Sequence, residues 1–195
     1  MPIDRHKAET VDITPELERI LAAVSYVIYI AERNGQRFTQ YDVVKTLFLA
    51  DRNHLNRFGR LITTDTYVAM IHGPVPSISY DLLKKNAFML RKLRIQDLPW
   101  RSDDAGQGKL IFRDADIGFV EDVLSPSDKS AIEAAVTSVS SLSFGQIRKL
   151  THEDAAYIDA WEDDSERKQF PMSLGLLFDT PNFEKAREIM DVSKL

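Results

Sequence analysis

The chain has 195 residues, of which 44% are hydrophobic and 28% charged, and it carries a net charge of −5 and no cysteine. A chain of this size and composition can bury a core without disulfides, and the lack of cysteine excludes thiolate zinc sites, iron–sulfur clusters and cysteine nucleophiles. The N-terminus is too polar for a signal peptide, and the apolar run near it is too short to span a bilayer, so we expect a soluble, cytoplasmic protein.

The N-terminal part of the sequence predicts an arm followed by two long helices. Residues 1–13 are expected to form a flexible arm. A first helix is expected from Thr14-Pro15 to Asn34-Gly35, because Thr is a good N-cap, Pro suits the first helical position, and apolar residues follow at spacings of three and four. A second helix is expected from its N-cap Thr39, with a capping-box carboxylate three residues later, to Gly59.

The middle of the chain contains most of the turn and strand signals. Residues 63–72 predict either a helix or a short extended segment. Residues 73–76 read Gly-Pro-Val-Pro, which cannot be helical throughout and is expected to form a rigid corner. Ser77 is expected to cap the next helix. Residues 93–100 and 109–113 alternate enough to form strands, and the polar, glycine-containing loop between them indicates a β-hairpin.

The C-terminal half predicts four further helices. Ser125-Pro126 starts one with an N-cap and a proline at the first position, and Ser143 starts a shorter one. Residues 155–161 are expected to be helical, and Thr180-Pro181 opens the last helix. No internal repeat or domain boundary is evident. The expected architecture is therefore a mainly α, single compact helical domain over residues 14–195, with a small β-hairpin.

The charge is unevenly distributed along the chain. Residues 1–100 contain 14 basic and 11 acidic residues, whereas residues 101–195 contain 11 and 19. The acidic half disfavours nucleic-acid binding, which depends on neutralising phosphates. A local basic cluster is the exception, and it consists of Lys84, Lys85, Arg91, Lys92 and Arg94. A solvated helix end beside acidic neighbours is its simpler interpretation, and a regulatory DNA-binding role is the alternative.

Asp51 and His54 are the most suggestive pair for chemistry. They lie three residues apart and so share one face of the second helix. His72 and His152 could join them in space, and such a cluster could bind a divalent metal or act in acid–base catalysis. However, the sequence contains no His-Glu-x-x-His spacing, no phosphate-binding loop and no nucleophile elbow. We therefore favour a structural role for Asp51 and His54, and we expect neither a metal nor another cofactor.

An ordered set of short motifs carries more information about the protein family than composition and periodicity do. It consists of Lys45-x-Leu-Phe-Leu-Ala-Asp-Arg-x-His-Leu55, Gly59-Arg60-x-Ile-Thr63, Tyr67-x-Ala69, Gly73-Pro-Val-Pro76 and Ile147-x-x-Leu-Thr-His152, with Trp161 downstream. This set resembles the Panacea family, which includes SocA-like antitoxins and phage-associated proteins. The resemblance implies a shared core over about residues 15–162 and a C-terminal helical extension over 165–195. The family often has tyrosine where this chain has Phe48.

The resemblance implies a non-enzymatic antitoxin of a toxin–antitoxin system, which neutralises a cognate protein toxin by direct binding. In SocA itself the antitoxin acts as a proteolytic adaptor that delivers its toxin to a Clp-type protease. The implied partners are thus the toxin and such a protease, with no membrane or nucleic acid. The residues expected to serve the fold or the partner are Lys45, Asp51, His54, Gly59, Gly73, Pro74, Val75, His152 and Trp161. The alternatives are a metal-dependent or acid–base enzyme that uses Asp51, His54 and His152, and a DNA-binding regulator.

Overall fold

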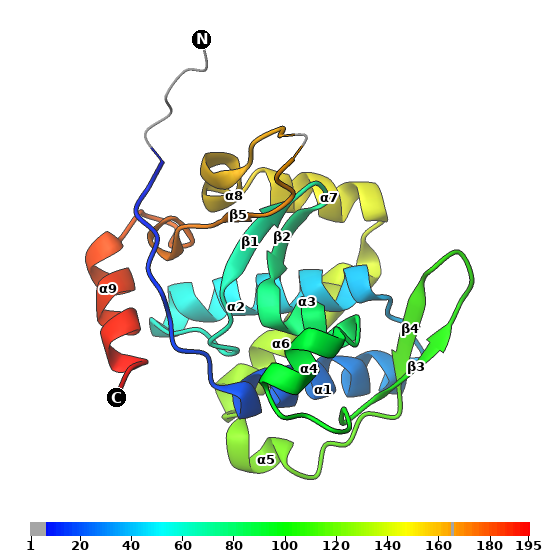
Figure 1. The fold of residues 1–195 in the computed structure, drawn as a ribbon. Coiled ribbons are helices and arrows are strands. Elements are labelled where there is room, and N and C mark those ends of the chain that lie inside the picture. Colours follow the sequence, from blue (N-terminus) through cyan, green and yellow to red (C-terminus); the bar gives the residue numbers. More distant parts are fainter. Residues whose placement is uncertain (1–6, 165) are drawn as a thin grey trace.

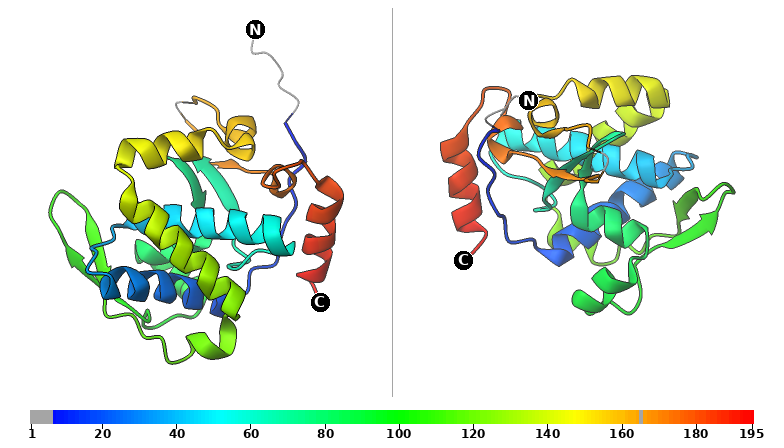
Figure 2. Two further views of the ribbon diagram at one scale, coloured as in Figure 1. Left: turned by 180° about the vertical axis from the view of Figure 1, so that it is seen from behind. Right: turned by 45° about the horizontal axis from the view of Figure 1, so that its top comes forward.

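The computed structural model describes residues 7–164 and 166–195. This part of the chain is mainly α-helical, as predicted, with small antiparallel sheets. Its helices are α1 (Leu17–Arg33), α2 (Gln40–Phe58), α3 (Ser77–Leu83), α4 (Ala87–Lys92), α5 (Val120–Val123), α6 (Pro126–Ser141), α7 (Phe144–His152), α8 (Ala155–Ala160) and α9 (Phe183–Val192), with a short 3-10 helix η1 (Leu174–Leu176). Helices α1, α2 and α6 pack against one another, and the view from behind shows α6 crossing the other two (Figure 2).

Two small sheets complete the described part. Their strands are β1 (Tyr67–Met70), β2 (Gly73–Pro76), β3 (Arg101–Asp104), β4 (Leu110–Arg113) and β5 (Phe170–Pro171). One sheet has the order β2-β1-β5, and the other is the β3–β4 hairpin. The β1–β2 hairpin packs on α2, and α7 and α8 lie beside its tip (Figure 1).

Helix α2 lies between two buried apolar clusters. Val43 and Leu47 belong to the first cluster, which α1 and α6 share. Phe48 and Leu55 belong to the second, which includes residues of β1, α8 and α9. Because α2 is covered on both sides, four of its polar side chains are buried too and must find partners inside the protein: Lys45, Thr46, Asp51 and His54.

Three predicted helix starts are confirmed in detail. Thr39, Ser125 and Ser143 are the N-caps of α2, α6 and α7, and each accepts a hydrogen bond from the amide three residues later. In each case the side chain at that third position returns a bond to the N-cap amide, which completes a capping box. Gly59 ends α2 in the left-handed conformation, with φ of 73°, as its position predicted.

Helix α1 begins later than its Thr14-Pro15 start signal predicted. Its N-cap is Glu16, which makes no side-chain capping bond. The amide of Thr14 instead donates to Ser193 Oγ at 2.9 Å, and the amide of Glu16 donates to Thr64 Oγ1 at 2.8 Å. These long-range bonds hold the segment extended, so the helix forms only beyond Glu16.

The segment before α1 lies along the surface in Figure 1. Residues 1–6 of the predicted flexible arm are outside the described part, and residues 7–13 form neither helix nor strand. Lys7 Nζ pairs with Glu162 at 2.6 Å, and the amide of Ala8 donates to the carboxylate of Asp159 at 3.1 Å. Residues 7–13 are thus tied to α8 and to the residues that follow it.

The prediction of a strand at residues 93–100 is wrong. Helix α4 occupies residues 87–92, and the chain then packs Leu93, Ile95 and Leu98 against the core in irregular conformation. The strand paired with β4 is β3, which falls in the predicted loop. An ion pair across the hairpin, from Arg113 Nε to Asp103 at 2.5 Å, joins the two strands. A strand of charged and polar residues has no alternation of apolar and polar residues, so that pattern could not have predicted β3.

The Gly-Pro-Val-Pro segment is also a strand rather than the predicted corner. It forms β2, and β1 confirms the extended alternative for residues 63–72. The prolines are tolerated because β2 is an edge strand of its sheet. Ser77 is not the N-cap of α3. Asp65 instead accepts the amides of Ile78 and Ser79, at 3.0 and 2.8 Å, and caps α3 from another part of the chain.

Candidate functional site

Asp51 is fully buried and holds the loop after α2. Its Oδ1 accepts the amides of Ile62 and Thr63 at 2.6 and 3.1 Å. Its Oδ2 accepts the hydroxyls of Thr63 at 2.5 Å and Tyr67 at 2.8 Å. Burial raises the pKa of Asp51, although these four hydrogen bonds favour its charged form. The carboxylate therefore ties the loop and the start of β1 to α2.

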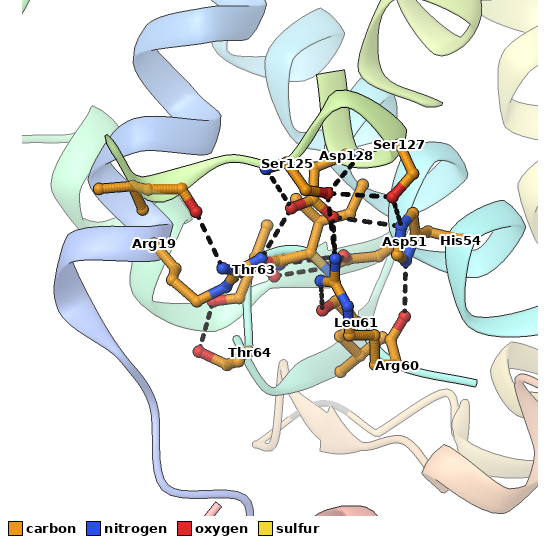
Figure 3. Close-up of polar contacts among 12 residues, drawn as sticks. Arg19, Asp51, His54, Arg60, Leu61, Thr63, Thr64, Ser125, Ser127 and Asp128 are labelled. Atoms are coloured by element: carbon orange, nitrogen blue, oxygen red, sulfur yellow. Dashed lines mark hydrogen bonds and ion pairs between the residues drawn. The ribbon is translucent and has the colours of Figure 1, made fainter. Parts of the chain in front are cut away.

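His54 lies one turn further along α2 and is also fully buried. Its Nδ1 lies 3.0 Å from the carbonyl oxygen of Arg60, and its Nε2 lies 3.1 Å from Ser127 Oγ (Figure 3). Nε2 is also 3.2 Å from Asp128 Oδ1. A donor at Nδ1 satisfies the carbonyl, so His54 links the loop after α2 to the N-terminus of α6.

Asp128 is the centre of this second network, and its side chain is fully buried. Oδ2 accepts the Ser125 amide at 2.9 Å and Arg19 Nη2 at 3.0 Å. Oδ1 lies 2.9 Å from Arg60 Nη2, at an angle that makes the contact ionic rather than a good hydrogen bond. Burial opposes the charge of Asp128, but the Ser125 amide, Arg60 and Arg19 outweigh it and lower the pKa of this carboxyl.

The two arginines carry the network outward from Asp128. Arg19 donates from Nε to the Ile62 carbonyl at 2.9 Å and from Nη1 to the Val123 carbonyl at 3.1 Å. The side chain of Arg60 is 42% exposed, and Arg19 and Arg60 line a cleft of about 420 Å³ beneath α9. The network therefore joins α1, α2, α6 and the 59–66 loop, and reaches solvent through Arg60.

A separate group of candidate residues surrounds the β1–β2 turn. The Lys45 side chain is fully buried, and its Nζ donates to the carbonyl oxygen of Pro74 at 2.7 Å. Burial lowers the pKa of Lys45 to about 7. Gly73 has φ of 102°, and a Cβ at this position would lie 2.8 Å from both Lys45 Nζ and Thr151 Oγ1. Only glycine therefore fits where β2 crosses Lys45 and α7.

His152 and Trp161 extend this second group through aromatic contacts. The rings of His152 and Tyr157 are 4.3 Å apart, and Trp161 stacks on Tyr157 at 6.0 Å with an interplanar angle of 7°. Tyr157 donates its hydroxyl to the Met70 carbonyl at 2.9 Å. Burial, together with the positive charges of the neighbouring Arg148, Lys45 and His72, lowers the pKa of His152 to about 4. Val75, also in this group, is buried and pairs with Val68.

The candidate residues thus fall into two groups with different contacts. Asp51 and His54 bond to the loop after α2 and to α6, whereas His152 lies against Gly73 and Tyr157. Across residues 7–164 and 166–195, no three His, Asp or Glu side chains are placed to hold a metal ion. The described contacts of Asp51 and His54 are to backbone and side-chain groups of the protein itself.

Several residues of these networks were not among the expected site residues, although Arg60 and Tyr67 belong to the motif set. Asp128, Arg19, Arg60, Tyr67 and Asp65 all bind the candidate residues or the segments beside them. The capping box identified Ser125 and Asp128 only as a helix start. A capping-box sequence does not indicate that the carboxylate of its third residue, here Asp128, also contacts two arginines.

One of three comparisons with known proteins identifies a family for this chain. A family model described as "Antitoxin SocA-like, Panacea domain" matches residues 43–157, which is more than half of the chain. The match begins within α2 and ends within α8, so it covers both groups of candidate residues except Trp161. No curated protein and no solved structure matches the chain. In the described part of the chain, none of the helices combines the length and apolar character needed to cross a membrane. The chain belongs to the SocA-like antitoxin family that carries the Panacea domain.

Proposed function

We propose that this protein is the antitoxin of a toxin–antitoxin pair and that it neutralises its toxin in the cytoplasm by binding it directly. Family membership supports the antitoxin role. The placement of Asp51 and His54 supports a binding module over an enzyme. Both side chains are fully buried and are held by bonds within the protein, so they serve the frame rather than a substrate.

Because the main motif residues are buried, a partner must be recognised by other residues that are exposed on the surface. Asp51 and Asp128 fix the loop after α2, and Lys45 fixes the β1–β2 turn from beneath. Such a frame keeps its internal contacts while its exposed residues vary. This division of roles suits a domain whose partners are protein surfaces.

Co-expression with the reading frame beside this gene tests the proposal. The adjacent protein should be toxic alone, should lose its toxicity with the wild-type chain, and should co-purify with it. Two variants give a matched comparison. Asp51→Ala should neutralise the toxin less well, because a smaller fraction of the protein is folded. Asp122→Ala removes an exposed carboxylate and should neutralise the toxin as well as the wild type does. Persistent toxicity with no co-purification would overturn the proposal.

Delivery to a Clp-type protease is the finer part of the proposal. If the protein is an adaptor, the toxin half-life should shorten when the chain is present, and deletion of the host protease should restore both toxin and toxicity. If it masks the toxin instead, neutralisation should persist without the protease. The toxin half-life in the two strains separates these routes.

A further inference from the structure

Helix α4 and the residues beside it form a surface of unusual charge, which we name the α4 patch. It comprises Lys84, Lys85, Phe88, Arg91, Lys92 and Arg94, all exposed. Residues 84–94 contain five basic residues and no acidic one. The remainder of the chain has 20 basic and 30 acidic residues, a net charge of −10. The positive charge is therefore local and stands against an acidic background.

The basic residues of the patch are not paired with the two acidic residues nearest in the chain, Asp81 and Asp97. Among the residues that the structure describes, none of the five forms an ion pair, whereas Arg19, Arg60 and Arg113 are each paired with aspartate. Lys84 makes only a cation–π contact, with its Nζ 5.0 Å from the Tyr80 ring. The five charges are therefore exposed to solvent and free of ion pairs within the described residues, so they are available to a partner.

An exposed aromatic ring lies among these charges. Helix α4 turns Met89 and Leu90 toward the core, where they pack against the first apolar cluster. Phe88 points the other way and is 66% exposed, and Arg91 and Lys92 follow it at spacings of three and four on the same helical face. In Figure 1 α4 lies on the side nearest the viewer, away from α8 and the acidic residues around it. An apolar anchor within a charged rim is the usual composition of a protein-binding hot spot.

We propose that the α4 patch is the surface that binds the toxin, and that the toxin presents acidic residues around an apolar pocket for Phe88. The proposal rests on the antitoxin function proposed above. A protein partner suits the patch better than a nucleic acid does. Charges interact over about 8–10 Å at physiological salt, so a polyanion that extends beyond the patch would meet the acidic remainder, whereas a protein contact needs only local complementarity.

Two variants test the patch in full-length protein, and each has a matched control. Arg91→Glu with Lys92→Glu reverses charge at the rim, and Phe88→Ala removes the anchor. Lys109→Glu with Lys168→Glu is the matched charge control, because both lysines are exposed and lie outside the patch, and Ile158→Ala, at 53% exposed, is the matched apolar control. All these side chains lie on the surface, and circular dichroism and urea unfolding establish that each variant is folded.

The readout is the affinity for the purified toxin encoded beside the gene, together with rescue of growth. Charge reversal should slow association about tenfold or more at about 0.1 M salt, and the difference should shrink at about 0.5 M salt. Phe88→Ala should weaken affinity about tenfold or more, mainly through faster dissociation. Both controls should bind and rescue as the wild type does.

Contrary outcomes separate this inference from the proposed function. If wild type neutralises the toxin and both patch variants bind with unchanged affinity, the inference is overturned and the antitoxin function stands. If the patch variants instead lose salt-sensitive binding to a duplex of the gene's own promoter while toxin affinity is unchanged, the patch is a nucleic-acid surface and the inference is again overturned. If wild type itself fails to bind or neutralise the toxin, the proposed function fails first.

Discussion

His54 of α2 and Asp128 of α6 meet in the interior, with Nε2 and Oδ1 3.2 Å apart and both side chains fully buried. The contact joins two helices that contribute to the same apolar cluster. Asp128 also receives Arg19 from α1 and Arg60 from the loop after α2. One buried carboxylate thus ties α6 to α1 and to the loop after α2 beside His54, so we expect its loss to be strongly destabilising.

Asp128→Ala should lower the free energy of unfolding by about 3 kcal/mol, near the low end for a broken buried ion pair. The low end applies because Arg60 remains 42% exposed, where water screens its charge. Urea unfolding followed by circular dichroism measures the loss. Glu121→Ala is the control, since Glu121 pairs with Lys129 at 2.7 Å while 75% exposed, and its loss should stay below about 1 kcal/mol. Equal losses in the two variants would contradict the central role of Asp128.

Asp51→Asn tests whether both carboxylate oxygens are needed. The amides of Ile62 and Thr63 and the hydroxyls of Thr63 and Tyr67 all donate to Asp51. An amide group replaces one acceptor with a donor, which leaves at least one buried group poorly paired at a cost of about 1–3 kcal/mol. Asp122→Asn, at an exposed carboxylate, should change stability by less than about 0.5 kcal/mol. An unchanged urea midpoint in Asp51→Asn would show that the loop does not depend on this carboxylate.

Gly73→Ala should destabilise the protein by about 3 kcal/mol, because it adds backbone strain at φ of 102° to a clash with Lys45 and Thr151 at 2.8 Å. Gly35→Ala provides the comparison. Gly35 also has positive φ, 73°, but a Cβ there meets nothing within 4 Å, so only the strain of about 1–2 kcal/mol remains. Thermal and urea unfolding of both variants give the difference. If the two glycines cost the same, the close packing of the β1–β2 turn on Lys45 is not what requires glycine.

Sequence reasoning succeeded where the signal was local. The N-caps Thr39, Ser125 and Ser143 and the terminal Gly59 each depend on residues within one turn of a helix, and the fold uses them as predicted. A capping box satisfies the free amides at a helix start whatever the helix later packs against. Local chemistry therefore predicted the main helices and the mainly α class.

Long-range partners account for what sequence reasoning missed. Asp65 caps α3 from 13 and 14 residues away, so the expected cap Ser77 is not used. Asp128 is 74 residues from His54, and nothing near either residue indicates that they meet. The strand β3 has the sequence Arg-Ser-Asp-Asp, which pairs with β4 as an antiparallel ladder and adds an ion pair, but it lacks the apolar alternation from which a strand is predicted. Each of these features depends on how elements pack, which periodicity along the chain does not record.

Lys45 should make the stability of the protein increase with pH above neutrality. Its buried amine has one carbonyl partner, at Pro74, and burial lowers its pKa to about 7. The same group in the unfolded chain has a pKa of about 10.4. Between these values the unfolded state binds more protons than the folded state, so the free energy of unfolding rises with pH. For one proton the slope reaches about 1.4 kcal/mol per pH unit.

Urea unfolding at pH values from about 7 to about 10, with wild type and Lys45→Met, measures this contribution. Methionine keeps an unbranched side chain but cannot titrate, so the variant should lack most of the rise. The half-buried His152 and the buried Asp65 act at lower pH, and the raised pKa values of Tyr26, Tyr41 and Tyr157 lower stability near pH 10 equally in wild type and variant, so the difference between the two proteins reports Lys45. His152 has a folded-state pKa of about 4, so its titration makes the free energy of unfolding rise with pH up to about 6.5. Burial raises the pKa of Asp65 to about 6, so its titration makes the free energy of unfolding fall as pH rises from about 4 to 6. The same slope in wild type and variant would mean that Lys45 stays charged in the folded protein, and that its contact with Pro74 is made by an ammonium group.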